Sequence, residues 1–125
     1  MIIADTSVWI EYLKGNEVYK SLFDSYLKRR QIAALSPVFG ELLQGVKNKR
    51  ERNIIAEFWH NMPHLDEKDL FIEAGMLSEE RKLFAFGVGL IDCYIMAAAI
   101  KYDFAVWTLD KKLLGAFDKV TGKSG

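Results

Sequence analysis

The sequence predicts an α/β domain in three layers, with a central, mainly parallel sheet of four to five strands flanked by helices. Short apolar runs of strand length alternate along the chain with longer segments whose apolar residues have helical spacing. Such alternation favours parallel pairing, because each crossover from strand to strand then carries a helix. Neither a linker nor an internal repeat divides the chain, so we expect one domain over residues 1–125.

Four segments have the length and composition of short strands. Residues 1–4 read Met-Ile-Ile-Ala, with two β-branched residues in a row and no polar side chain, which is typical of a buried central strand. The other expected strands are residues 32–35, the minimal pair 64–65, and residues 104–107.

Helical spacing accounts for most of the remaining chain, with expected helices over 8–13, 17–30, 38–46, 54–62, 67–84, 90–102 and 111–114. Ser36 and Pro37 are typical of an N-cap followed by proline in the first turn. Asp66 is expected to cap the helix that starts near Glu67. The polar tail from 119 to 125 is expected to fray. The apolar stripes of residues 18–27 and 54–62 could serve either the core or an interface between subunits.

Composition narrows the class of protein. A hydrophobic content of 50% over 125 residues supports a packed core and excludes disorder. Lys+Arg and Asp+Glu are both 17, so strong non-specific binding of nucleic acid would need a local basic patch. The single cysteine excludes an internal disulfide and suits a reducing compartment. Asp5 comes too early for a signal peptide, and no apolar run is long enough to span a bilayer. We expect a soluble, cytoplasmic protein with no membrane partner.

Four acids follow expected strands or open the helices that come next. Asp5 ends the first strand, Glu41 lies about a turn into the helix after the second, Asp92 opens the very apolar helix 90–102, and Asp110 follows the last strand. Right-handed crossovers in a parallel sheet bring such positions to one edge. Asp5 alone would be equally well explained as a helix N-cap. Together, the four acids predict a shared acidic site.

Clustered carboxylates repel one another unless a cation joins them. Oxygen ligands without clustered Cys or His suit Mg²⁺ or Mn²⁺, and such an ion can activate water against a phosphodiester. The neighbouring hydroxyls of Thr6, Ser7 and Thr108 could orient these carboxylates or waters, although each could equally be a local helix or turn cap.

Four stretches, in this order, resemble the PIN-domain ribonucleases and, more narrowly, the VapC-type toxins of toxin–antitoxin pairs: Ile3-Ala4-Asp5-Thr6-Ser7-Val8-Trp9-Ile10, Ser36-Pro37-Val38 leading to Glu41-Leu42-Leu43-Gln44-Gly45, Leu90-Ile91-Asp92-Cys93-Tyr94-Ile95-Met96-Ala97-Ala98-Ala99, and Trp107-Thr108-Leu109-Asp110. The resemblance covers nearly the whole chain. It implies Mg²⁺- or Mn²⁺-dependent RNA cleavage, a homodimer, and inhibition by a small VapB-type antitoxin through which operator DNA is bound.

By position, the resemblance assigns Asp5, Glu41, Asp92 and Asp110 to catalysis and metal binding. One departure concerns Lys112 and Leu113, which stand where many relatives have a further acid or histidine and then an aromatic residue. This departure places a second metal site in doubt.

A basic cluster could supply the phosphate contacts that an acidic site lacks. Its members could form a solvated loop or a rim that binds RNA, and the same two interpretations apply to Arg81 and Lys82. The cluster consists of Lys47, Lys49, Arg50 and Arg52.

Two other functions use the same residues. A PIN-type nuclease of RNA processing would share the site but have a different partner. A phosphoacceptor signalling domain would use Asp5 as a metal ligand and Thr108 with Lys111 as a switch pair. Signalling domains of that kind usually carry paired acids after the first strand, whereas Thr6 and Ser7 follow Asp5 here.

Overall fold

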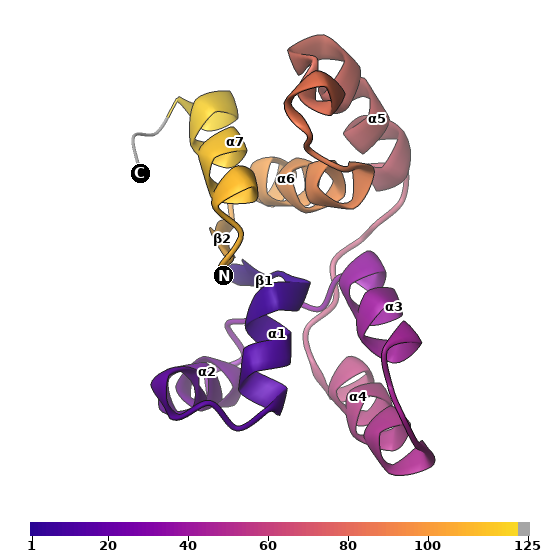
Figure 1. Ribbon diagram of the computed structural model, residues 1–125, viewed down its shortest axis with the longest axis vertical. Helices are drawn as coiled ribbons and strands as arrows, with labels where there is room; N and C mark the ends of the chain where they lie inside the picture. Colours follow the sequence, from indigo (N-terminus) through magenta and orange to yellow (C-terminus); the bar gives the residue numbers. More distant parts are fainter. Residues whose placement is uncertain (123–125) are drawn as a thin grey trace.

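The computed structural model describes residues 1–122 and is a mostly helical α/β structure. Strands β1 (Ile2–Ala4) and β2 (Ala105–Trp107) lie at its centre. The helices are α1 (Thr6–Leu13), α2 (Glu17–Lys28), α3 (Ser36–Gln44), α4 (Lys49–Asn61), α5 (Leu70–Arg81), the 3₁₀ turn η1 (Leu83–Phe86), α6 (Leu90–Tyr102) and α7 (Lys111–Thr121). Figure 1 shows α1 to α4 on one side of the strands and α5 to α7 on the other.

The sheet is parallel, as the sequence predicts, but the expected count of four to five strands is wrong. Within residues 1–122 only β1 and β2 form a ladder, with Ile3 opposite Val106. The expected strands at 32–35 and 64–65 contribute single parallel bridges instead, from Ile2 to Ile32 and from Ala34 to His64.

The chain itself explains why these two bridges do not lengthen into strands. The Ala33 N–H donates to the Ile2 carbonyl at 2.9 Å, and the Ala34 N–H donates to the Pro63 carbonyl at 2.8 Å. Helix α3 begins at Ser36, so the first segment leaves the sheet almost at once. Pro63 has no N–H to continue a ladder. Beyond β1, the pairing therefore consists of single bridges, first from Ile2 to Ile32 and then from Ala34 to His64.

The core joins both groups of helices to the strands. Trp9 of α1 is 1% exposed, and its ring centroid lies 4.8 Å from that of Phe23 and 5.2 Å from that of Phe39. Helix α6 is buried from Cys93 to Ala99, in keeping with the very apolar composition of residues 90–102. The two apolar stripes divide between core and solvent: Phe23 and Ile55 are buried, whereas Val18, Leu22 and Ile54 are exposed.

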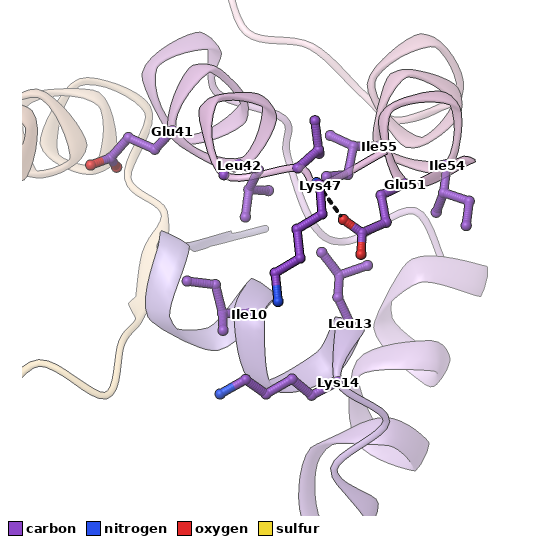
Figure 2. A pocket seen from close by; sticks show the side chains of 11 residues that line it. Ile10, Leu13, Lys14, Glu41, Leu42, Lys47, Glu51, Ile54 and Ile55 are labelled. Atoms are coloured by element: carbon purple, nitrogen blue, oxygen red, sulfur yellow. Dashed lines mark hydrogen bonds between the residues drawn. The ribbon is translucent and has the colours of Figure 1, made fainter. Parts of the chain in front are cut away.

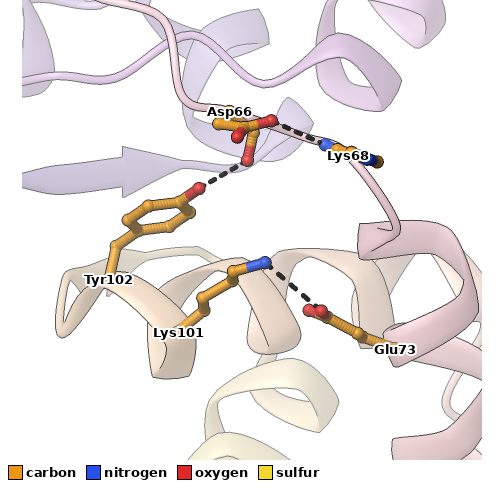
Figure 3. A network of polar contacts seen from close by, with 5 residues as sticks. All are labelled: Asp66, Lys68, Glu73, Lys101 and Tyr102. Carbon is orange, nitrogen blue, oxygen red and sulfur yellow. Dashed lines mark hydrogen bonds and ion pairs between the residues drawn. The ribbon is translucent and has the colours of Figure 1, made fainter.

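A polar network ties α5 and α6 to the segment before them (Figure 3). Lys101 Nζ pairs with Glu73 Oε1 at 3.2 Å, and the Tyr102 hydroxyl donates to the Asp66 carbonyl at 2.5 Å. Asp66 does not cap a helix that starts near Glu67, as the sequence suggested. Its carboxylate accepts the Lys68 N–H at 3.0 Å and forms a local turn, because α5 begins only at Leu70.

The last helix is longer than the expected 111–114 and continues to Thr121. Ala116, Phe117 and Val120 pack against the core, and this burial extends the helix beyond its first turn. The expected fraying is therefore wrong for residues 119–121, and residues 123–125 lie outside the described part of the chain. No helix within residues 1–122 has the length and apolar character required to cross a membrane.

Candidate active site

Asp5 lies between the two strands and the first helix. It is 5% exposed and is the one buried charged residue among residues 1–122. Its backbone N–H donates to the Trp107 carbonyl of β2 at 3.0 Å, and its Oδ1 accepts the Val8 N–H at 3.2 Å as the N-cap of α1. Asp5 is therefore a helix cap, but its burial against both strand ends goes beyond what capping requires.

Two hydroxyls hold the Asp5 carboxylate. Ser7 Oγ donates to Asp5 Oδ1 at 2.5 Å, and Thr108 Oγ1 donates to Asp5 Oδ2. Ser7 Oγ also accepts the Leu109 N–H at 3.1 Å, which links α1 to the segment that follows β2. The orienting role predicted for Ser7 and Thr108 thus has the geometry that it requires.

Glu41 and Asp110 are exposed and are each fixed through one oxygen. Thr6 Oγ1 of α1 donates to Glu41 Oε1 of α3 at 2.7 Å. Asp110 caps α7, with its Oδ1 accepting the Lys112 N–H at 2.9 Å, and its own N–H donates to Thr108 Oγ1 at 2.9 Å. Thr108 therefore contacts two of the four acids.

Asp92 lies within electrostatic reach of the other three acids. It lies half-buried in the first turn of α6. Burial raises the pKa of Asp92 first, and the negative charges of Asp110, Asp5 and Glu41 raise it further, against a hydrogen bond with the Gly89 backbone that lowers it. The charges of the carboxylates at the starts of α7 and α1 and on α3 therefore reach Asp92 on α6.

Three of the four acids keep a carboxylate oxygen that can accept further hydrogen bonds. A carboxylate oxygen can accept about two hydrogen bonds. Asp5 Oδ1 accepts two, from Ser7 and Val8, whereas Asp5 Oδ2 accepts only that of Thr108. Glu41 Oε2 and Asp110 Oδ2 accept none from residues 1–122. Each of these three acids thus has one oxygen anchored and another with remaining capacity.

This donor set fits a hard divalent cation in its chemistry. All four groups are carboxylates, and the charges of Asp110, Asp5 and Glu41 disfavour ionised Asp92 unless a positive charge offsets them. Among residues 1–122 no three His, Cys, Asp or Glu side chains form a preformed ligand cage. A cation that keeps several waters and takes few protein ligands, as Mg²⁺ does, is compatible with such an open arrangement.

One member of the predicted basic cluster, Lys47, lies beside Glu41. Lys47 lines a groove together with Glu41, and its backbone N–H donates to Glu51 Oε2 at 2.8 Å. Lys49, Arg50 and Arg52 lie in the exposed first turn of α4 rather than in a loop. The role of these residues as an RNA rim stays a prediction.

One supporting residue was missed in the sequence. Glu67 accepts hydrogen bonds from the Ser36 N–H at 3.1 Å, from Ser36 Oγ at 2.8 Å and from the Tyr94 hydroxyl at 2.7 Å. It caps α3 from 31 residues away, in place of the expected Ser36 side-chain cap. No local sequence pattern identifies such a long-range cap. Ser36 before Pro37 is typical of an ordinary N-cap, and Glu67 is typical of the first turn of a helix.

Comparison with known proteins places this arrangement in a family. The chain matches no curated protein. The PIN domain family matches residues 2–122, which includes all four acids and the three hydroxyls. PIN domains are generally nucleases and typically use divalent metal ions. The chain belongs to the PIN domain family.

Proposed function

We propose that this PIN domain is a Mg²⁺- or Mn²⁺-dependent endoribonuclease and acts as the toxin of a toxin–antitoxin pair. The observation that carries the proposal is how the acids are held: Thr108 Oγ1 bonds both the Asp5 carboxylate and the Asp110 N–H, and Thr6 Oγ1 bonds Glu41. The charges of these three acids also raise the pKa of Asp92. Three hydroxyls that anchor these acids support it. A charge cluster of this kind is costly unless it serves binding or catalysis.

Each residue has a distinct task in this proposal. Asp5, Glu41, Asp92 and Asp110 would hold the cation. Ser7 and Thr108 would keep Asp5 in one rotamer, and Thr6 would keep the exposed Glu41 directed toward α1. When bound, a divalent cation offsets charge on the phosphoryl oxygens and lowers the pKa of its bound water. The protein side chains themselves supply the negative charge that holds the cation, and they fix where it is held.

The proposed nucleophile is water, because within residues 1–122 the three hydroxyls at the site donate to Asp5 and Glu41 and the one thiol lies in the core. Cys93 is fully buried, and burial raises the pKa of its thiol, so it is a core residue. Water would therefore attack phosphorus, the P–O3′ bond would break, and the 3′ oxygen would leave as a hydroxyl. The products are a 5′-phosphate and a 3′-hydroxyl.

A groove beside the acidic site supports the proposed antitoxin. It has a volume of about 480 Å³ and lies between α1, α3 and α4 (Figure 2). Ile10 and Leu13 come from α1, and Ile54 and Ile55 come from α4. Lys14 and Lys47 accompany Glu41 and Glu51, so the charges of the lining balance. An apolar groove with balanced charge suits an amphipathic protein segment, such as part of a small VapB-type antitoxin.

The proposed homodimer has a candidate surface on α5 and η1. Phe71, Ile72, Met76 and Phe84 are 54%, 62%, 59% and 86% exposed. Large apolar side chains exposed together are typical of interfaces. This surface differs from the stripes of α2 and α4 considered from the sequence, whose central residues are buried.

The test is cleavage of single-stranded or loop RNA by the purified protein, with EDTA, Mg²⁺ or Mn²⁺, and chemical analysis of both new ends. We expect metal-dependent cleavage that leaves a 5′-phosphate. Full activity in excess EDTA, or a cyclic phosphate product, would contradict the proposal. Asp92→Asn should be inactive, whereas Glu57→Gln, an exposed carboxylate change on α4, should cleave like the wild type.

The toxin role has a separate test, because an RNA-processing nuclease would cleave by the same site. The reading frame adjacent to this gene should encode a small protein with a DNA-binding half. Expression of the nuclease alone should arrest growth, and co-expression of the neighbour should restore it. Metal-dependent cleavage without growth arrest, and without such a neighbour, would favour the RNA-processing function. Stable phosphorylation by a small phosphodonor would instead favour a signalling domain.

A further inference from the structure

We propose that a basic and aromatic pocket between η1 and α7 binds the single-stranded RNA segment that leaves the acidic site. The pocket has a volume of about 270 Å³. Four cations line it, and none of its lining residues is acidic: Arg81, Lys111, Lys112 and Lys119 surround Leu83, Phe86, Gly115, Ala116 and Val120. This inference rests on the proposed nuclease function and identifies where its substrate is held.

The charge of this pocket is not neutralised within the protein. None of the four cations forms an ion pair with an acid in residues 1–122, where the two ion pairs are Lys14 with Glu11 and Lys101 with Glu73. The chain as a whole has no net charge. The pocket therefore carries a local excess of positive charge, which would attract the phosphates of RNA.

Two of the cations that line the pocket follow one of the four acids directly in the sequence. Lys111 and Lys112 follow Asp110 directly, and the Lys112 N–H donates to Asp110 Oδ1 at 2.9 Å. The Lys112 side chain extends to the turn before α6, where a Cβ on Gly87 would lie 3.4 Å from Nζ. That turn leads into Asp92. Lys111 and Lys112 thus connect the pocket to Asp110 and to the turn that precedes Asp92.

An aromatic ring stands beside the cations. Phe86 is 63% exposed, and Lys119 Nζ lies 4.8 Å from its ring centroid. A cationic groove with an exposed aromatic ring is the combination that binds single strands, because the cations contact phosphates and the ring stacks on a base. The pocket is smaller than the roughly 300–1,000 Å³ of most small-molecule sites, which suits one unit of a longer chain.

The groove beside Glu41, which contains only Lys47 of the predicted rim, lacks this combination. The groove that contains Lys47 also contains Glu41 and Glu51 and is lined mainly by aliphatic side chains. Phosphates that approach four carboxylates are repelled, so the affinity for RNA must come from neighbouring uncompensated cations. The pocket between η1 and α7 supplies them, whereas the groove between α1, α3 and α4 does not.

The experiment measures binding of a short fluorescent oligouridylate to the whole protein in EDTA, by anisotropy, across a range of salt concentrations. Two doubly substituted proteins remove the same charge: Arg81→Gln with Lys119→Gln in the pocket, and Lys49→Gln with Arg52→Gln on α4. We expect the pocket variant to bind about tenfold more weakly. Its salt dependence should lose about 1.4 units of slope, or about 0.7 for each phosphate contact removed. The α4 variant should bind like the wild type.

A third variant separates stacking from charge. Phe86→Leu should weaken binding and leave the salt slope unchanged, because no cation is lost. All replaced residues are exposed, and circular dichroism will verify folding. Pocket variants that bind like the wild type, an α4 variant that is weakened equally, or equally tight binding of labelled polyglutamate would each overturn the inference. Cleavage with Mn²⁺ is measured in parallel, and its absence from the wild type would contradict the proposed function, whatever the binding shows.

Discussion

Thr6 Oγ1 donates to Glu41 Oε1 at 2.7 Å and so connects the first turn of α1 to a carboxylate on α3 that lies 35 residues further along the chain. Glu41 is exposed, and this hydroxyl is its one side-chain partner within residues 1–122. An exposed glutamate loses rotamer freedom when it is held, so an anchoring bond can decide how often it faces the site.

Replacing Thr6 by valine should therefore impair activity without unfolding the protein. Valine keeps the β-branched shape and removes the hydroxyl, so Glu41 would sample other rotamers. We expect RNA cleavage to fall by about tenfold or more, in the range seen when residues that orient metal ligands are lost. Thr6→Ser should retain most activity, because it keeps the donor. Equal rates for the valine and serine variants would show that this bond is incidental.

A second prediction concerns Glu67, which caps α3 from a distant segment. It accepts hydrogen bonds from Ser36 and from the Tyr94 hydroxyl, and burial together with Glu67 raises the pKa of Tyr94 to about 12. Glu67→Ala should lower the free energy of unfolding by about 1–3 kcal/mol, because it removes a helix cap and leaves a tyrosine hydroxyl without its acceptor. Urea denaturation provides the measurement.

Glu57→Ala is the matched control for that experiment. Glu57 is exposed on α4, and its carboxylate accepts no hydrogen bond within residues 1–122. Its replacement should change the unfolding free energy by less than about 0.5 kcal/mol. If both variants were equally stable, the bonds of Glu67 would contribute nothing to the position of α3.

The sequence predicts the helices and the acidic site better than the sheet. Asp5 and Asp92 could be predicted because each follows a strong local signal, a β-branched strand in one case and a glycine break in the other. Burial of α6 from Cys93 to Ala99 could likewise be read from its apolar composition. These features depend on residues that are neighbours in the sequence.

The features that could not be predicted depend on contacts between distant segments. Residues 32–35 have strand composition, yet Ile32 and Ala34 form only single bridges, because pairing length depends on where the neighbouring segments turn away. The cap supplied by Glu67 and the pocket that joins Arg81 to Lys119 are likewise assembled from separate elements. The available signals for that pocket were Arg81, considered from the sequence as a possible RNA contact, and the adjacent Lys111 and Lys112 after Asp110.

A third prediction concerns the groove proposed for the antitoxin. Ile54 lines this groove and is 42% exposed, so an acidic side chain there should not disturb the core. Ile54→Asp should abolish neutralisation by the neighbouring gene product and leave RNA cleavage unchanged. Val18→Asp is the control, since Val18 is 78% exposed on α2 and lies outside the groove. Pull-down and growth rescue measure the effect, and equal rescue of both variants would exclude this groove as the binding site.

The last prediction concerns stability of the metal-free protein. Burial and the charges of Asp110, Asp5 and Glu41 raise the pKa of Asp92. A carboxylate whose pKa is raised on folding binds more protons in the folded state than in the unfolded state. Unfolding then releases protons, so the free energy of unfolding falls as the pH rises from the unfolded pKa of about 3.9 through the raised folded value. Above that window the full penalty remains.

Asp92→Asn should remove this penalty, because asparagine keeps the shape and carries no charge. We expect the variant to be inactive in cleavage yet more stable than the wild type in EDTA at neutral pH, with a weaker dependence of stability on pH. Attraction between Asp92 and the N-terminal end of α6 acts in the opposite direction, but it is typically about 0.3–1 kcal/mol and is screened by salt. Thermal unfolding across the mildly acidic to neutral range measures the balance, with Glu57→Gln as the control for loss of one carboxylate.

Adding metal tests whether Asp92 belongs to the cation site. A ligand that binds only the folded state stabilises it, so Mg²⁺ or Mn²⁺ should raise the melting temperature of the wild type. The effect should be smaller for Asp92→Asn, because one of the carboxylates that offset the cation's charge is absent, and it should be unchanged for Glu57→Gln. If the variant is instead less stable than the wild type in EDTA, and both respond equally to metal, then Asp92 is a structural cap of α6. In that case the repulsion from Asp110, Asp5 and Glu41 is too weak to define an active site.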